Sequence, residues 1–444
     1  MRALVVAYAF PPTGGAGVGR PLKMVKYLGL HGVTGSVLTV QNPSVPVRDD
    51  SLVGEIPAGT EIIRTRTFEP AYAVKQAGWV ASSRPNTSAS LPRRALGWAA
   101  SIARHGLVPD PQILWQPSAQ LALARRLWRG VDDAVLITAP PFSQFLLGPL
   151  ARLRPGTGVV LDYRDEWSTV REVFDTKATL PARVGAAMEA HLIRSAHVVT
   201  TATEGFRQNL LKRFPFLEPA RVMTIPNGYD PADFADSLPG PPPDASHLTV
   251  TYAGTVFRLT SARGLMGGLR RLHAAEPELA RHLRVRFLGR IVDTEADAFA
   301  GAEALGVERV GYVPHDEVAR ALVSSHLALC ILDDAPFVER VYPAKVFELM
   351  YLASRFGLRT LTLTSPGALA ELVTAHQLGP IVPPRDEAAI AAFFAAELRA
   401  FVNGVRPPAA SPVGIERYDR RVLAGDFARA LREALARAQA SRHR

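Results

Sequence analysis

The chain has 444 residues and a formal net charge of +10, with 48% hydrophobic and 21% charged residues. This balance is ordinary for packed globular proteins and excludes a wholly disordered chain. A single hydrophobic core stops growing at roughly 250–300 residues, so we expect two domains.

Apolar, β-branched runs alternate with helical patterns along the chain, which is typical of parallel α/β folds. The first series of expected strands covers residues 3–7, 36–40, 61–64, 135–138, 158–162, 197–201 and 221–225. A second series covers residues 248–252, 283–288, 327–332 and 359–363. A proline-rich segment at 236–247 separates them, and it can continue neither a helix nor a central strand. We therefore predict two Rossmann-like, doubly wound domains over residues 1–240 and 241–412.

Two further segments have helical patterns. Residues 413–444 are expected to form a closing helix that packs back on the first domain, with Val422, Phe427, Leu431 and Leu435 near one face. Residues 91–105 combine arginines with apolar residues. They are predicted to form either a helix packed on its own domain or a basic amphipathic helix at a membrane surface.

The positive charge does not point to nucleic acid. Only six of the 51 basic residues are lysines, and the arginines are scattered over the expected helices. Because there is no nucleic-acid motif and no aromatic stacking cluster, we expect no nucleic-acid partner. An anionic lipid surface stays open as a partner.

The apolar segments also bear on location. No apolar run reaches the 18 residues typical of a membrane span. The start of the chain is interpreted as a buried strand rather than a signal peptide. We therefore expect a cytoplasmic protein, with a peripheral place at the inner face of the membrane left open. The single cysteine, Cys330, lies in an apolar run and is predicted to be a buried thiol.

A glycine-rich loop at residues 10–19 follows the first expected strand. Backbone N–H groups and a helix N-terminus in that position can face phosphate oxygens. The loop is not a P-loop, because Arg20 and Pro21 stand where a lysine and a hydroxyl residue are needed. It is not a dinucleotide fingerprint either, because the second strand ends without the ribose-binding acid. Gly14 and Gly15 are therefore predicted to approach a phosphate or a sugar, with a simple tight turn as the alternative.

Asp162, Arg164 and Asp165 stand at the carboxyl end of the fifth expected strand. Ligands of open parallel sheets bind at this edge. Either carboxylate is a candidate for positioning or deprotonating an acceptor hydroxyl. A helix cap and an ion pair would explain the same residues equally well, so both interpretations stay open.

Lys345 and Glu348 belong to a Tyr-Pro-Ala-Lys-Val-Phe-Glu segment at 342–348. Pro343 suits the first position of a helix, which places Lys345 in the first turn and Glu348 one turn later on nearly the same face. A cation at a positive helix end suits a diphosphate, and the carboxylate suits ribose hydroxyls. The alternative is a surface ion pair of little energetic weight.

The sequence predicts no bound metal and no cofactor. It contains no Asp-x-Asp triplet, and its eleven histidines show no paired ligand spacing.

Together these segments resemble family 4 of the GT-B glycosyltransferases over nearly the whole chain. The resemblance rests on the glycine loop, on Pro-Pro at 140–141 and on Asp-Tyr-Arg-Asp-Glu-Trp at 162–167. It continues through residues 225–230, 252–255, 311–315, 342–349 and 366–372. It implies a retaining, metal-independent transfer from a UDP-, GDP- or dTDP-linked sugar. The nucleotide would lie mainly on the second domain and the acceptor on the first.

Site residues follow from matching positions. The donor-binding candidates are Gly14, Gly15, Gly254, Thr255, Val313, Lys345 and Glu348, with Arg258 and Arg263 as stand-ins for the usual diphosphate-binding pair. The catalytic candidates are Asp165 and Lys345, and the acceptor-side candidates are Asp162, Arg164 and Asn227.

Two positions depart from the family pattern. Arg340 stands eight positions before Glu348, where many relatives have a glutamate, and Phe142 replaces the usual histidine near the first-domain site. A nucleotide-sugar epimerase of the same fold and a non-catalytic partner protein therefore remain as alternatives. A lipid-linked saccharide, a polysaccharide and a natural product all remain open as acceptors.

Overall fold

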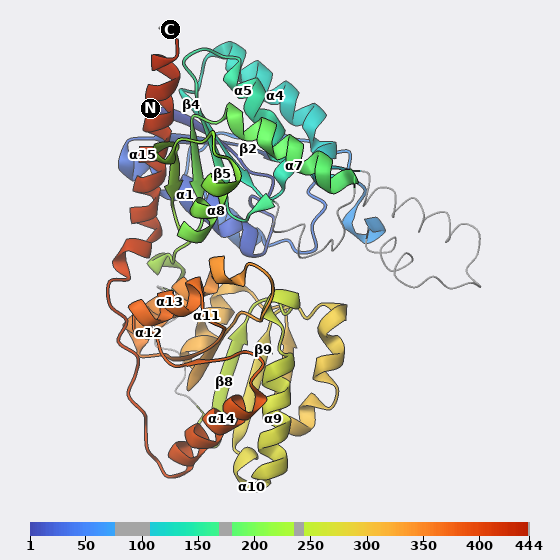
Figure 1. The fold of residues 1–444 in the computed structure, drawn as a ribbon, viewed down its shortest axis with the longest axis vertical. Helices are drawn as coiled ribbons and strands as arrows, with labels where there is room; N and C mark the ends of the chain where they lie inside the picture. Colours follow the sequence, from blue (N-terminus) through green and yellow to red (C-terminus); the bar gives the residue numbers. More distant parts are fainter. Residues whose placement is uncertain (76–106, 168–179, 235–243, 443–444) are drawn as a thin grey trace, which may run out of the picture. The chain divides into compact units, whose positions relative to one another are not determined.

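The computed structural model describes residues 1–75, 107–167, 180–234 and 244–442 (Figure 1). It divides into unit 1, Met1–Pro226 with Arg420–Arg444, and unit 2, Asn227–Asp419. The chain thus enters unit 2 earlier than the boundary at residue 240 that the sequence suggested. Residues 91–105, and 236–243 of the proline-rich segment, lie outside the described residues.

Unit 1 is built on a seven-stranded sheet whose paired strands are parallel. The spatial order is β3-β2-β1-β4-β5-β6-β7. The strands are β1 (Arg2–Val6), β2 (Thr34–Val40), β3 (Ile62–Thr65), β4 (Ala134–Ala139), β5 (Gly158–Tyr163), β6 (Val198–Thr201) and β7 (Val222–Thr224). This is the doubly wound order, which reverses direction between β1 and β4.

Each face of the unit 1 sheet carries its own apolar core, because successive strand residues point to opposite faces. Leu4 and Val6 lie in one core, and Ala3 and Val5 in the other. The first core includes residues of α4 (Gln116–Arg129), α5 (Leu147–Arg152), α7 (Leu180–Leu192) and α8 (Glu204–Arg213), and the second includes residues of α1 (Ala16–Leu28) and α15 (Arg420–Ala440). Figure 1 shows helices on both sides of the strands.

The last helix, α15, packs directly on unit 1. A Cβ atom at Gly158, the first residue of β5, would lie 2.6 Å from the backbone nitrogen of Leu435. The helix backbone therefore approaches the sheet as closely as a glycine permits. The predicted apolar face is wrong at one position: Val422 is half exposed, and Leu423 is buried instead.

Unit 2 has a six-stranded sheet with the order β10-β9-β8-β11-β12-β13, again with parallel pairs. Its strands are β8 (Leu248–Ala253), β9 (Leu283–Leu288), β10 (Val307–Gly311), β11 (Leu327–Ile331), β12 (Arg359–Leu363) and β13 (Ile381–Val382). Its helices include α9 (Arg263–Ala275), α10 (Pro277–Ala280), α11 (His315–Val323), α12 (Lys345–Phe356), α13 (Ala368–Ala375) and α14 (Glu387–Val402). The order reverses direction between β8 and β11.

The fold class predicted from the sequence, two doubly wound parallel-sheet domains, is confirmed. The sequence missed β10 and β13 because one is an edge strand with exposed charged residues and the other has two residues. Cys330 is fully buried in β11, as predicted, and burial raises the pKa of its thiol to about 11. Within the described ranges, no helix is long and apolar enough to cross a membrane.

Candidate functional site

The predicted motifs lie at the carboxyl ends of the central strands of each sheet. The glycine loop follows β1 and the Pro-Pro segment follows β4, while Gly254 and Thr255 follow β8. Strand order reverses between β1 and β4 in one sheet and between β8 and β11 in the other. Ligands of open parallel sheets bind beside such a reversal. The topology thus places the candidate residues at the ligand-binding edge of both sheets.

The two glycines of the loop after β1 have different surroundings. Gly14 donates its N–H to the Val47 carbonyl at 3.0 Å, and a Cβ there would lie 2.8 Å from the Val47 side chain. Gly14 is therefore a packing glycine whose N–H is already used. Gly15 is exposed, has a φ of 92° and caps the N-terminus of α1. Gly15 is the residue that the structure leaves at an open helix end, where anions bind.

Asp162 is buried within an ion pair. Its carboxylate accepts from Arg20 Nη2 at 2.7 Å, and from the hydroxyls of Thr138 and Thr200 at 2.7 Å each. Burial pushes the pKa of this carboxyl up, but Arg20 and the two hydroxyls outweigh it and hold the pKa below its ordinary value. The exposed fraction of Asp162 is 0%. It ties β5 to α1, β4 and β6, and it offers no surface to an acceptor, contrary to its predicted place.

Arg164 also has a structural explanation. Pro21 lies inside α1 and lacks an N–H, so the carbonyl of Gly17 loses its helical hydrogen bond. Arg164 Nη1 donates to that carbonyl, and its other nitrogens donate to the carbonyls of Ala139 and Pro140. The guanidinium therefore joins the start of α1 to the loop after β4.

Asp165 differs from these neighbours because the residue is exposed directly after β5, although desolvation raises the pKa of its carboxyl against the lowering effect of Arg164 and Arg20. Of the three predicted polar residues in this segment, Asp165 is the one that is exposed as a residue. Phe142, the residue in place of the usual histidine, is buried and stacks on Trp167 with ring centroids 5.1 Å apart. That position supplies aromatic packing and no titratable group.

Lys345 begins α12 in unit 2. Pro343 was predicted to be the first helical residue, but the helix starts at Lys345, with Pro343 in the turn before it. The Lys345 ammonium lies 3.8 Å from the ring centroid of Tyr252. It is buried and has no hydrogen-bond partner among the residues that the structure describes. A Cβ at Gly254 would lie 2.6 Å from this nitrogen, so the structure brings these two predicted residues together.

Three glycines with positive φ end three neighbouring strands, and the first of them, Gly254, lies beside this lysine. Gly254, Gly289 and Gly311 follow or end β8, β9 and β10, with φ of 133°, 129° and 85°. Gly289 donates its N–H to the Gly311 carbonyl at 2.6 Å, and a Cβ at Gly289 would lie 2.4 Å from the Gly254 carbonyl. Only glycine fits such close backbone packing. The sequence analysis did not single out Gly289, although a glycine directly after a strand was the available signal.

The two arginines that stand in for the diphosphate-binding pair, Arg258 and Arg263, have different surroundings. Arg263 forms an ion pair with Asp297 at 2.6 Å and lies 3.4 Å from Glu295. These acids, Asp297 first, raise the pKa of its guanidinium. Arg258 lies exposed in the 3-10 turn Arg258–Thr260, close after the exposed Thr255. Arg258 is thus the stand-in nearer in sequence to the Gly254 loop.

The remaining predicted residues of unit 2 are half-buried. Glu348 lies one turn after Lys345, and Val313 follows β10. Asn227 is the first residue of unit 2, so the acceptor-side candidates are divided between the two units. Arg340 forms an ion pair with its neighbour Glu339.

Residues 79–233 match the family model described as Glycosyltransferase Family 4. The chain is similar to the solved structure of the lipopolysaccharide outer core galactosyltransferase WaaB, with a TM-score of 0.53, 14% identity, and 97% of this chain and 99% of that chain covered. The chain is also similar to a structure described as trehalose-6-phosphate from E. coli bound with UDP-2-fluoro glucose. The TM-score is 0.56 and the identity 12%, with 100% of this chain and 98% of that chain covered. A third similar structure is Anabaena HepE in complex with UDP and glucose. Its TM-score is 0.51 and its identity 12%, with 100% of this chain and 98% of that chain covered. A search of curated protein sequences gives no match.

The chain has the GT-B fold. The predicted resemblance to family 4 of the GT-B glycosyltransferases is confirmed, and fold and family match together support sugar transfer as the class of activity. In GT-B terms, unit 1 is the N-terminal Rossmann-like domain with its returning helix, and unit 2 is the C-terminal one.

Unit 1 has a hollow that the sequence analysis did not predict. It has a volume of about 430 Å³ and is lined by Gln41, Asn42, Arg66, Thr67 and Phe68, at the carboxyl ends of β2 and β3. Asn42 fixes its wall by accepting from the Thr67 N–H at 2.9 Å and donating to the Thr67 carbonyl at 3.2 Å. Phe68 is 70% exposed. The available signal in the sequence was the pair of amides Gln41 and Asn42 directly after β2. The sequence analysis used this strand end only to exclude a dinucleotide fingerprint.

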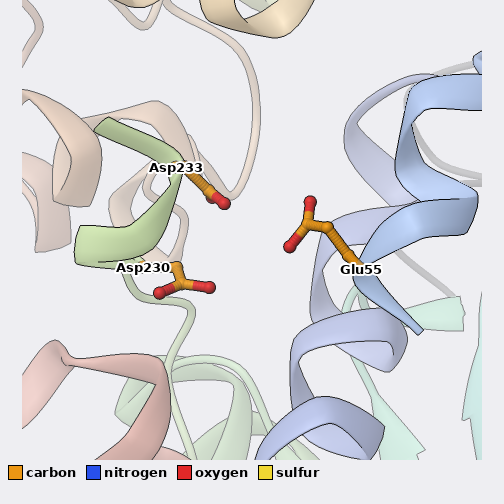
Figure 2. A group of neighbouring side chains, drawn as sticks. All are labelled: Glu55, Asp230 and Asp233. Carbon is orange, nitrogen blue, oxygen red and sulfur yellow. The ribbon is translucent and has the colours of Figure 1, made fainter. Parts of the chain in front are cut away.

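Figure 2 shows three carboxylates, Glu55, Asp230 and Asp233. Glu55 belongs to unit 1, where Lys23 and Lys26 both form ion pairs with it. Asp230 and Asp233 belong to unit 2, in and beside the 3-10 turn Pro231–Phe234. Since Glu55 belongs to one unit and the two aspartates belong to the other, we assign no metal site to these carboxylates.

Proposed function

We propose that this chain is a retaining glycosyltransferase that moves a sugar from a nucleotide diphosphate sugar to a hydroxyl acceptor without a metal ion. The observation that best supports this proposal is the buried Lys345 ammonium. It lacks a hydrogen-bond partner among the described residues and lies beside the Gly254 loop. A buried, unpaired cation costs free energy in the empty protein, and a bound anion would offset that cost. The UDP bound to HepE and the UDP-2-fluoro glucose bound in the E. coli structure support a UDP-type donor. GDP- and dTDP-linked sugars stay within the proposal.

On the donor side, unit 2 supplies the groups that receive the diphosphate. Lys345 and the positive N-terminal end of α12 would stabilise the charge that develops as the sugar–phosphate bond breaks. Arg258 is the arginine that we propose as a further diphosphate contact. Glu348 would accept hydrogen bonds from the ribose, and the backbone at Val313 would flank the base.

On the acceptor side, unit 1 supplies Asp165, an exposed residue directly after β5 whose carboxyl has a raised pKa because of desolvation. We propose that it receives the proton of the acceptor hydroxyl as the new glycosidic bond forms on the same face of the sugar. Retention follows if the acceptor enters on the face from which the diphosphate leaves.

The hollow at β2 and β3 is the place that we propose for the acceptor's own sugar rings. An exposed aromatic ring offers an apolar platform to the C–H face of a sugar, while Arg66 and the two amides offer donors to its hydroxyls. The Phe68→Ala variant should raise the KM for the acceptor about tenfold or more, while the nucleotide Kd stays constant. An unchanged acceptor KM would place the acceptor elsewhere.

The deciding experiment is calorimetric titration of the protein with UDP, GDP and dTDP in EDTA. Binding of one diphosphate in EDTA is the expected result, and binding that requires added Mg²⁺ would overturn the metal independence. Absence of binding by all three would favour a non-catalytic protein. The matching nucleotide sugars are then incubated without acceptor, and conversion of the sugar to an epimer would favour an epimerase.

A further inference from the structure

The outer face of α4 in unit 1 combines exposed apolar and basic residues. Trp128 is 92% exposed and Leu121 is 51% exposed, while Arg125 and Arg129 are exposed between and beside them. Positions 121, 125 and 128 follow one another at helical spacing, so they form one stripe along α4. The opposite side of the helix is buried in the core of the unit. Nothing in the packing of α4 requires this stripe to be apolar.

The end of α5 extends the stripe. Figure 1 shows α5 beside α4, and Gln120 of α4 donates to the Leu146 carbonyl at 2.9 Å. A Cβ at Gly130, directly after α4, would lie 2.6 Å from Arg154 Nη2. Leu153, which precedes that arginine, is 76% exposed. We call Leu121, Arg125, Trp128, Arg129 and Leu153 together the α4–α5 face.

The charge of the α4–α5 face has a single sign. Between residues 111 and 161 the only acidic residues are Asp132 and Asp133. Asp132 is buried and paired with Arg126, and Asp133 accepts from the Arg2 N–H at 2.8 Å. No ion pair joins Arg125 or Arg129 to another described residue. The face therefore presents uncompensated positive charge around exposed leucine and tryptophan side chains.

We propose that the α4–α5 face binds an anionic phospholipid surface. Tryptophan is favoured at the level of lipid headgroups because its ring is apolar and its N–H is polar. Leucine side chains gain free energy on entering the acyl boundary, and arginines pair with headgroup phosphates. A two-fold contact between copies of this chain would set the same arginines against each other, which charge repulsion opposes. This proposal does not rest on sugar transfer.

The test is sedimentation of the full chain with vesicles of phosphatidylcholine alone and of phosphatidylcholine with one quarter phosphatidylglycerol. We expect binding to the anionic vesicles only. The Arg125→Ser/Arg129→Ser variant should bind about thirtyfold more weakly, about fivefold for each arginine removed from the surface. The Trp128→Ser/Leu153→Ser variant should bind about tenfold more weakly or worse. Because these side chains are exposed, thermal unfolding of the variants should match that of the wild type.

Matched controls use exposed residues away from the face. Leu30 is 67% exposed in unit 1, and Arg271 is exposed on α9 of unit 2. Neither Leu30→Ser nor Arg271→Ser should change vesicle binding. Equal loss in these controls, or no binding by the wild type, would overturn the proposal. So would loss of binding on Arg93→Ser/Arg94→Ser alone, or light scattering that finds a dimer which Trp128→Ser converts to monomer.

Discussion

The Lys345→Met variant separates a ligand-binding lysine from a structural one. Methionine has a similar length and no charge, so it fills the space beside Tyr252 and Gly254 without an ammonium group. In the empty protein the substitution removes one cation–π contact, worth about 0.5–2 kcal/mol. It also removes the cost of burying an unpaired charge, which acts in the opposite direction. We therefore expect the free energy of unfolding without ligand to change by less than about 1 kcal/mol, or to rise.

The effect on nucleotide binding should be much larger. A hydrogen bond between a charged donor and a phosphate oxygen contributes about 1.5–3 kcal/mol, which corresponds to about a 10- to 150-fold weaker Kd. Urea unfolding without ligand and calorimetric titration with the diphosphate that binds the wild type measure the two quantities. Lys212→Met, which removes an exposed lysine of α8, serves as the control and should change neither.

Two results would refute the reasoning about Lys345. If the empty variant loses several kcal/mol of stability, the lysine supports the fold and its buried ammonium is not held for a ligand. If stability and nucleotide affinity both stay at the wild-type values, the diphosphate binds elsewhere.

Three predictions concern the fold of unit 1. Asp162→Ala should lower the free energy of unfolding by about 3–5 kcal/mol in urea at pH 7, because it leaves Arg20 buried without its partner. A loss below about 1 kcal/mol would contradict this. Gly158→Ala should destabilise by about 1–3 kcal/mol because the new Cβ would meet the backbone of α15, whereas Gly19→Ala, where a Cβ would meet nothing within 4 Å, should stabilise α1 by up to about 1 kcal/mol. The pKa of His197 is lowered to about 3, mainly by burial, so its protonation opposes folding. Stability should therefore fall as the pH drops from about 6.5 toward 3, by up to about 1.4 kcal/mol per pH unit, and His197→Asn should flatten that slope in urea titrations between pH 7 and 4.5.

Much of the fold followed from the sequence because buried parallel strands are continuous apolar runs. Every central strand of both sheets was predicted within a few residues of its observed bounds. The strands that were missed, β10 and β13, lie at the edge of their sheet, where exposure or shortness weakens the apolar pattern.

The sequence by itself also determined which motifs follow which strands, and hence that the glycine loop, Asp165, Gly254 and Lys345 belong at the carboxyl edges of two sheets. It did not distinguish polar residues that serve the fold from polar residues open to a ligand. That distinction depends on partners that lie far along the chain. Asp162 is enclosed by Arg20 and two hydroxyls from neighbouring strands, whereas Asp165, three residues later, is exposed.

Only the tertiary structure decided these assignments. Arg164 donates to the Gly17 carbonyl, which lacks a helical partner because of Pro21, and this accounts for the arginine at that position. The contact with Val47 accounts for the glycine at position 14. The hollow beside Phe68 and the α4–α5 face needed three-dimensional neighbours, because exposure of an apolar side chain is not encoded in its own position along the chain. The buried, unpaired ammonium of Lys345 belongs to the same class of fact, since burial and the absence of a partner are properties of what surrounds a residue.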